Sequence, residues 1–208
     1  MRQQKQYGVP HGVALWLGMQ GVSFGTTWLV KRIRQQQSPN SPEESSKQDQ
    51  RYYRTLKQPT FAPPGWVFGP VWFLNTILEV AGIIHVANQK PGAYRRRYLA
   101  VKSASVAIYS TFNAFNFGLK TTLGSAVLTI VDLFVNVTSL SLALKNKDQR
   151  AAWSHLPLIP WLSLASVLAV CIAAWNRDPF FKVPAAVADP NPKYLKPAPT
   201  SSHEKAKV

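Results

Sequence analysis

Long apolar runs limit most narrowly what this chain can fold into. Five of them, each about twenty residues long, cover approximately 11–30, 66–87, 99–119, 123–144 and 154–176. A helix of that length crosses a hydrocarbon core of about 30 Å. A single helix over 99–144 would be about 69 Å long, so we expect a reversal near 118–124. The sequence predicts an all-α integral membrane bundle of five transmembrane helices with disordered termini.

Polar segments flank and interrupt these runs. We expect a polar head over 1–10, a flexible insertion over 35–50 and a disordered tail over 179–208 that is rich in Pro and Lys. Such compositions bury too little apolar surface to order themselves. The predicted membrane domain is therefore 11–178.

The net charge of +15 raises the question of an anionic partner. The basic residues border the apolar runs, as at Lys31, Arg32, Arg95–Arg97 and Lys145, and form no single stripe. This placement is typical of membrane spans, whose ends meet anionic headgroups. We expect a lipid bilayer as partner and no nucleic acid. The single Cys171 excludes a disulfide framework, and no His, Cys or carboxylate pair has the spacing of a metal site.

The segment 52–72, YYRTLKQPTFAPPGWVFGPVW, leads into the second run. A proline pair suits the first turn of a helix but not its interior, so a helix should begin close to Trp66, directly after Pro63 and Pro64. Trp66 and Trp72 then lie where indole rings favour a lipid interface.

The same segment resembles the signature of a known family. The order of Pro59, Phe61, Pro63, Pro64, Trp66, Gly69, Pro70, Val71 and Trp72 is similar to that of the translocator protein family, also called the tryptophan-rich sensory protein or peripheral benzodiazepine receptor family. Asn113 and Asp132 match its third- and fourth-helix positions, and Pro157 with Trp161 matches the opening of its fifth helix. The resemblance covers about 11–178 and implies a five-helix bundle.

Two departures from the family pattern concern its ligand pocket. The family's W-x-W-like pair and proline after the third-helix Asn are replaced by Ala114–Phe117, and its fifth-helix Asn-Tyr pair is replaced by Ala169 and Val170. We expect the shape of the pocket to be kept while its polar groups differ.

The resemblance implies a membrane protein that binds flat ligands, either tetrapyrroles such as porphyrin and haem or sterols, with a transport, trafficking or sensing role. Neither a tetrapyrrole nor a sterol is expected to be an obligatory cofactor, although a bound porphyrin or haem is possible. For any one aromatic, packing or an interfacial position is the alternative to ligand contact. The candidate lining residues are Phe61, Pro63, Pro64, Trp66, Phe68, Trp72, Phe112, Asn113, Phe115, Asp132 and Trp161.

Glu79 and Asp132 are acidic residues inside predicted spans. A carboxylate there costs about 2.5–3.5 kcal/mol on insertion scales, so both should face the bundle interior. Each either accepts a hydrogen bond from a ligand or joins helices. His85 and His155 lie near span ends and are expected at the interface.

Two alternatives to a binding protein stay open. Some family members are reported to degrade porphyrin, but the missing W-x-W pair counts against this, and no catalytic residues are assigned. The other is a membrane interaction scaffold without a ligand. A homodimer is a further expectation, as is the mitochondrial outer membrane or endoplasmic reticulum for a eukaryotic member.

Overall fold

The computed structural model describes residues 6–35, 52 and 54–197. Within that part the chain is helical and has no strand beyond one isolated bridge, between Pro59 and Leu195, which confirms the predicted all-α class. The long helices are α1 (Val9–Gln35), α3 (Gly65–Ala87), α4 (Ala93–Asn113), α5 (Thr122–Lys145) and α7 (Leu158–Trp175). The short ones are α6 (Gln149–Trp153), a π-helical turn (Ala114–Leu119) and a 3-10 turn (Pro192–Tyr194).

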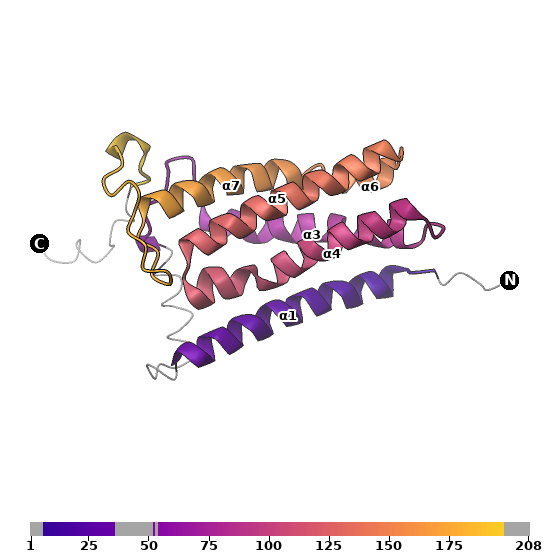
Figure 1. Cartoon of the computed structure of the whole chain (residues 1–208), viewed down its shortest axis with the longest axis horizontal. Coiled ribbons are helices and arrows are strands. Elements are labelled where there is room, and N and C mark those ends of the chain that lie inside the picture. The colour runs from indigo at the N-terminus through magenta and orange to yellow at the C-terminus, as the bar shows by residue number, and fades with distance from the viewer. Residues whose placement is uncertain (1–5, 36–51, 53, 198–208) are drawn as a thin grey trace, which may run out of the picture.

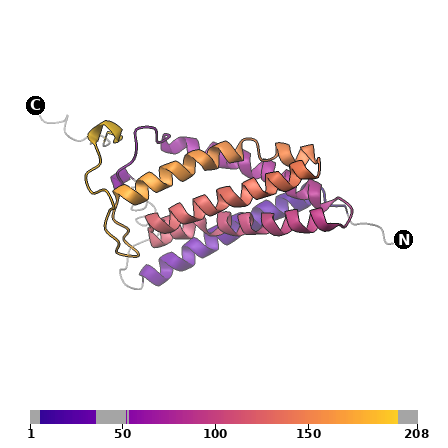
Figure 2. The same ribbon diagram turned by 45° about the horizontal axis from the view of Figure 1, so that its top comes forward.

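The long helices run side by side as one elongated bundle (Figure 1). Helix α5 packs against both α4 and α7, and α1 packs against α4 and the π-helical turn. Turning the view brings α7 and α5 forward, with α3 behind α7 and α1 on the far side (Figure 2). Helix α1 begins at one end of the bundle, whereas the chain after α7 lies at the other (Figure 1).

Four described helical segments are long and apolar enough to cross a membrane: Val9–Arg34, Gly65–Ala87, Thr122–Lys145 and Gln149–Trp175. Helix α4, which carries the third predicted span, is not one of them. Its first turns hold Arg95–Arg97, and Lys102 follows one turn after Tyr98. The chain is thus an integral membrane protein with four candidate spans. Its remaining long helix, α4, is more polar than these four.

Proline sets the start of two helices. Helix α3 begins at Gly65 directly after Pro63 and Pro64, which confirms the predicted start. The predicted fifth span, 154–176, overlaps the candidate span Gln149–Trp175, but its first residues, 154–157, form a turn and α7 begins at Leu158. A proline lacks the amide hydrogen that a continuous helix would need at that position.

The reversal between α4 and α5 lies where helix length required it. Lys120 adopts a left-handed backbone with φ of 57°, and its carbonyl accepts a hydrogen bond from the Tyr52 hydroxyl. Gly118 lies so close to α1 that a Cβ there would be 2.9 Å from Val30 Cγ1. The Gly118 carbonyl also accepts a hydrogen bond from Arg34.

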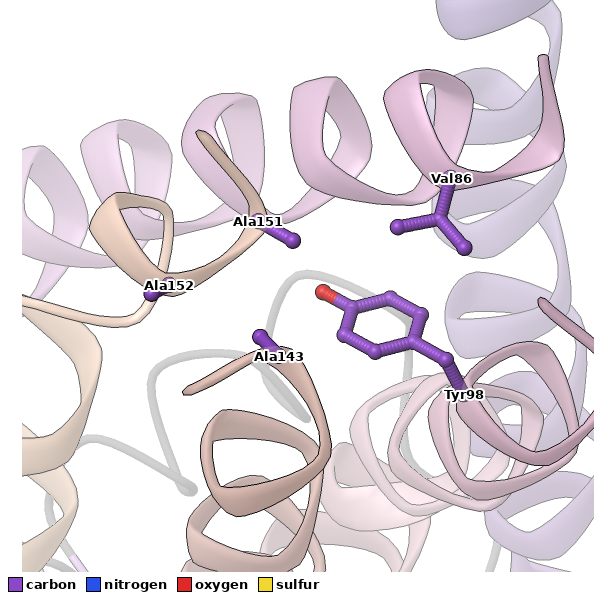
Figure 3. Packing of buried hydrophobic residues seen from close by; sticks show 5 residues of the cluster. All are labelled: Val86, Tyr98, Ala143, Ala151 and Ala152. Carbon is purple, nitrogen blue, oxygen red and sulfur yellow. The ribbon is translucent and has the colours of Figure 1, made fainter. Parts of the chain in front are cut away.

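Small residues dominate the tightest packing in the bundle. Figure 3 shows the Tyr98 ring reaching between Val86 and a group of alanines, Ala143, Ala151 and Ala152. Large apolar side chains such as Phe73, Phe134 and Trp153 are exposed instead. Close contact through small residues, with bulky residues outside, is the pattern of helices packed in lipid.

The first part of the tail, residues 179–197, is ordered, although disorder was predicted from residue 179 onward. Residues 179–197 fold back over the segment before α3: the Thr60 amide donates to the Tyr194 carbonyl, and the Lys196 amide donates to the Gln58 carbonyl. The Lys196 ammonium also donates to the Ala62 carbonyl. Composition alone missed this because the tail's partners belong to a distant segment. Three predicted segments lie largely outside the described residues. They are the insertion, of which only Gln35 at the end of α1 is described, the first half of the head, and the end of the tail.

Candidate functional site

One face of α3 carries an aromatic and polar series. Phe68, Trp72, Asn75 and Glu79 follow one another at the spacing of a single helix face. The Phe68 ring lies 5.3 Å from the Trp161 ring of α7 at an interplanar angle of 74°. Trp72 lies 5.6 Å from Tyr109 of α4. This face therefore meets α7 near its start and α4 one turn later.

Three buried polar groups on α3 and α7, the helices that carry Phe68, Trp72 and Trp161, make no hydrogen bond within the described part of the chain. These groups are the side-chain amide of Asn75, with both its nitrogen and its oxygen, the indole Nε1 of Trp161, and the Oγ of Ser166 on α7. Asn75 is 1% exposed. A buried polar group without a partner costs about 1–3 kcal/mol, and most such groups in native proteins are satisfied. These groups can donate to, and accept from, the polar edge of a bound molecule.

The structure brings only some of the predicted lining residues to this face. Phe68, Trp72 and Trp161 lie on it. Asn113 does not, because its side chain donates to Ser23 Oγ of α1 at 3.0 Å. Phe115 is close to Gly124 at the start of α5.

Five other lining candidates are exposed or half-buried. Trp66 is 76% exposed and Phe61 is 47% exposed. Pro63 and Pro64 form the extended entry to α3, and Phe112 is half-buried near the end of α4. Exposed aromatics at a helix start fit the interfacial alternative given above.

Two cavities lie away from the predicted lining residues. One, of about 600 Å³, lies along the second half of α3 and is lined by Leu78, Ala81, Gly82, His85, Arg150, Trp153, Ser154, Leu156 and Pro157. Another, of about 460 Å³, adjoins it at the end of the bundle and contains His85, Asp148 and Arg150.

Glu79 and Asp132 belong to a buried network that joins α3, α4 and α5. Lys102 Nζ lies 2.5 Å from Glu79 Oε1 and donates to Asn136 Oδ1 at 2.7 Å. Ser105 Oγ lies 3.1 Å from Glu79 Oε1 and 2.7 Å from Asp132 Oδ1. Both carboxylates thus face the bundle interior, and each joins helices.

Sequence reasoning missed Lys102, Ser105 and Asn136. Lys102 stood inside the predicted third span, and that position was a sufficient signal, because a lysine there needs an acidic partner. The serine and the asparagine carried no comparable signal. Polar residues of these types are common on helices packed in membranes.

A second polar cluster lies at the other end of α3. Asp148 Oδ1 is 2.9 Å from His85 Nε2, and Asp148 Oδ2 accepts from Gln89 and from the Tyr94 hydroxyl. Burial opposes ionisation of Asp148, but hydrogen bonds from the Ala151 amide and these side chains outweigh it and lower its pKa. The described residues hold no group of three metal-ligating side chains.

His155 is not at the interface as predicted. It is 1% exposed, and its Nε2 lies 3.1 Å from the Tyr98 hydroxyl. Tyr98 itself is fully buried. It is the tyrosine of a short basic–tyrosine–aliphatic pattern, residues 96–101, of the type proposed to contact sterols, and this pattern does not present its tyrosine to lipid.

Asp178 forms a third polar centre, at the end of the bundle nearest the tail. It accepts hydrogen bonds from the Thr121 hydroxyl at 2.7 Å and from the amides of Leu123, Phe180 and Phe181. Burial alone would raise the pKa of Asp178, but the hydrogen bonds from these donors have the larger effect, so the pKa is lowered. The residue ties the chain after α7 to the first turn of α5.

Comparison with known proteins places this architecture. The model of the TspO/MBR family matches residues 13–175, which includes α3, α4, α5, α7 and all of α1 after its first turn. The Tryptophan-rich protein TspO of Chlorobaculum tepidum is 30% identical over 130 residues, covering 60% of this chain and 79% of that protein. A protein of the same name from Archaeoglobus fulgidus is 27% identical over 128 residues, covering 61% and 81%.

A relative with a different name is similar over the same extent. Protein CrtK of Rhodobacter capsulatus is 23% identical over 131 residues, covering 62% of this chain and 79% of that protein. The match to the family model spans well over half of the chain and agrees with the resemblance of segment 52–72. This integral membrane protein belongs to the TspO/MBR family.

Proposed function

We propose that this protein binds a flat, largely apolar molecule with a polar edge at the α3 face formed by Phe68, Trp72 and Asn75, together with Trp161 and Ser166 of α7. The ligand class that fits best is a tetrapyrrole, porphyrin or haem. The associated role is transport, trafficking or sensing. We also propose that α4 crosses the membrane with the four candidate spans, which makes it the third of five transmembrane helices in chain order.

The observation that carries the proposal is the set of unpartnered buried polar groups on the two helices whose aromatic rings meet, α3 and α7. Asn75 can both donate and accept, the Trp161 indole donates and the Ser166 hydroxyl does either. A conjugated ring can lie against Phe68 and Trp161 while its nitrogens or carboxylates meet these groups. Entry would require the aromatic side chains to separate, since they pack together here.

A tetrapyrrole suits this site better than a sterol. A sterol offers a single hydroxyl, which would satisfy at most one or two of the three side chains. A porphyrin offers ring nitrogens and propionate carboxylates. The sterol-type pattern at 96–101 adds little support, because Tyr98 is inside the bundle.

The polar character of α4 does not prevent it from crossing the membrane. Its Lys102 and Ser105 are buried against α3 and α5, which pair them with Glu79, Asp132 and Asn136. A helix whose polar side chains are paired inside the bundle exposes mainly its other face to lipid. The mean hydropathy of α4 by itself does not reflect this pairing of its polar side chains.

Two other readings rank below ligand binding. Porphyrin degradation gains no support from this chain, because Ala114–Phe117 replace the family's W-x-W-like pair and the proline that follows it. A scaffold without a ligand leaves the unpartnered Asn75 and Trp161 without an explanation.

Titration of the full-length protein in lipid nanodiscs with protoporphyrin tests the proposal. We expect saturable quenching of tryptophan fluorescence, weakened about tenfold by Asn75→Leu, because a lost buried hydrogen bond costs about 1–2 kcal/mol. Trp161→Phe should weaken binding similarly, whereas Trp153→Phe, a change at an exposed residue, should leave the affinity unchanged. Absence of saturable quenching would leave the scaffold reading ahead.

Illumination of the same complex separates binding from degradation. We expect the porphyrin absorption to decay at the same rate with wild-type protein and with Trp161→Phe at equal occupancy. A faster, protein-dependent decay with a defined product would instead favour the enzyme.

A further inference from the structure

The charges of the buried network joining α3, α4 and α5 do not balance. It contains two carboxyl groups, Glu79 and Asp132, and one ammonium, Lys102, with exposed fractions of 4%, 5% and 1%. If both carboxyls were ionised, one net negative charge would be held inside a membrane bundle. An uncompensated buried charge is strongly unfavourable, and such groups neutralise by changing their protonation.

The hydrogen bonds of Ser105 point to the same conclusion independently of charge. Its Oγ contacts oxygens of both carboxyl groups, Glu79 Oε1 at 3.1 Å and Asp132 Oδ1 at 2.7 Å. A serine hydroxyl carries one hydrogen and can donate to only one of them. The other oxygen pair at hydrogen-bonding distance needs a hydrogen from the carboxyl group itself.

Asn136 cannot supply that hydrogen in place of a carboxyl group. Its Oδ1 accepts from Lys102 at 2.7 Å, which fixes the orientation of the amide. The Nδ2 then faces Ser105 Oγ at 3.1 Å and the carbonyl and Oδ1 of Asp132. These contacts use both hydrogens of the Asn136 amide nitrogen. The two contacts between Ser105 Oγ and the carboxyl oxygens of Glu79 and Asp132 still have only the one serine hydrogen between them.

The position of the lysine decides which carboxyl group is ionised. Lys102 Nζ lies 2.5 Å from Glu79 Oε1, and no ion pair joins Lys102 to Asp132 among the described contacts. Glu79 is therefore the counter-ion of the ammonium. Asp132 can donate its proton to Ser105, whose hydroxyl then donates to Glu79.

We propose that this network is a proton-binding site inside the membrane bundle, holding one dissociable proton on Asp132 at neutral pH. The proton makes the network electrically neutral and completes the series from Asp132 through Ser105 and Glu79 to Lys102. The inference does not depend on ligand binding at the aromatic face.

The surrounding elements add few other ionisable groups. Helix α4 contributes Tyr98, one turn before Lys102; its other ionisable residues are Tyr94 and Arg95–Arg97 in its first turns and Tyr109. The connection after α6 contributes His155, which is hydrogen-bonded to Tyr98. Outside the network, α3 carries His85 and α5 carries Lys145, both in the last turn. Helix α6 carries Arg150, and α7 carries only Cys171. The ionisable residues of α1 are confined to its ends, His11, Lys31, Arg32 and Arg34.

Infrared spectroscopy of the full-length protein in phosphatidylcholine nanodiscs tests the site directly. A protonated carboxyl group gives a carbonyl band that shifts when water is replaced by deuterium oxide. We expect one such band in the wild type at neutral pH. Asp132→Asn should abolish it, and Asp189→Asn, a change at an exposed carboxylate, should leave it unchanged.

Two further variants distinguish a shared proton from an isolated protonated acid. Glu79→Gln should also abolish the band, because Asp132 must then ionise to balance Lys102. Lys102→Met removes the only ammonium of the network, so both carboxyl groups should be protonated and the band should double in area. Helical circular dichroism and elution as a single species establish that each variant is folded.

The proposal is overturned by a wild type without the band at neutral pH. It is equally overturned by a band that survives both Asp132→Asn and Glu79→Gln, or by a folded Lys102→Met variant whose band is unchanged. If Lys102→Met fails to fold, the two amide variants decide the matter, since they keep the size of the side chains they replace.

Discussion

The carboxylate of Asp178 accepts a hydrogen bond from the Thr121 hydroxyl at 2.7 Å and so joins the chain after α7 to the start of α5. Thr121 in turn accepts from the Gly124 amide and caps α5. Because Asp178 also holds the amides of Phe180 and Phe181, one buried side chain organises both the helix start and the first turn of the tail.

Replacement of Asp178 should destabilise this end of the bundle. Asp178→Ala removes the acceptor of several hydrogen bonds, including the Leu123 amide of α5, and we expect a loss of about 2 kcal/mol in unfolding free energy. Thermal denaturation in nanodiscs measures it. Asp189→Ala, at an exposed position, should change the melting temperature little. Equal effects of the two variants would contradict the capping role.

Acid should weaken the contacts that Asp148 makes between the α5–α6 connection and α3. Its pKa is lowered by hydrogen bonds in the folded state, so the stabilisation is present above the ordinary aspartate value of about 3.9 and is lost as pH falls through the lower folded value. We expect the melting temperature of the wild type to fall more steeply below about pH 4 than that of Asp148→Asn. Parallel curves for the two proteins would contradict this.

Gly82 should tolerate no side chain while Ser154 is present. A Cβ at position 82 would lie 2.3 Å from Ser154 Oγ and 2.9 Å from its Cβ, so Gly82→Ala should cost about 1–3 kcal/mol through overpacking. The double variant Gly82→Ala with Ser154→Gly should recover much of the loss. Gly69→Ala, which meets open space on the same helix, serves as the control in thermal denaturation.

The ordered tail should protect the Thr60 amide from exchange with solvent. That amide donates to the Tyr194 carbonyl at 2.9 Å. Truncation after Pro190 removes the acceptor, and we expect hydrogen exchange at Thr60 to become at least tenfold faster, by mass spectrometry of the protein in nanodiscs. The Val187 amide, which donates to Ala174, should keep its protection in the truncated protein. Unchanged exchange at Thr60 would show that the tail does not hold this segment.

Much of the architecture was predictable because helix starts and lengths are local properties. The prolines at 63 and 64 predicted the beginning of α3 to within one or two residues, and the length limit on 99–144 predicted the reversal at Lys120. The beginning of α7 was missed by a few residues because the apolar run continues through a turn. The ordered tail was missed because proline-rich composition gives no indication of a distant partner.

The site was only partly predictable. Phe68, Trp72 and Trp161 were predicted to line a pocket; the structure pairs the rings of Phe68 and Trp161, and places Trp72 against Tyr109. Asn113 was expected there too, yet it contacts α1, because its position on α4 turns it toward Ser23. Neither Asn75 nor Ser166 attracted notice in the sequence. What distinguishes them is burial without a partner, and that exists only once the helices are assembled.

The sequence by itself determined that apolar helices of membrane-spanning length are joined at proline and polar breaks, and that the chain belongs to its family, because periodicity, length and motif order are properties of neighbouring residues. Only the tertiary structure decided that Lys102 meets Glu79 while Asp132 meets Ser105 and Asn136. Hydrogen bonds and ion pairs act over a few ångströms, and the distances between residues on α3, α4 and α5 are set by how the helices pack.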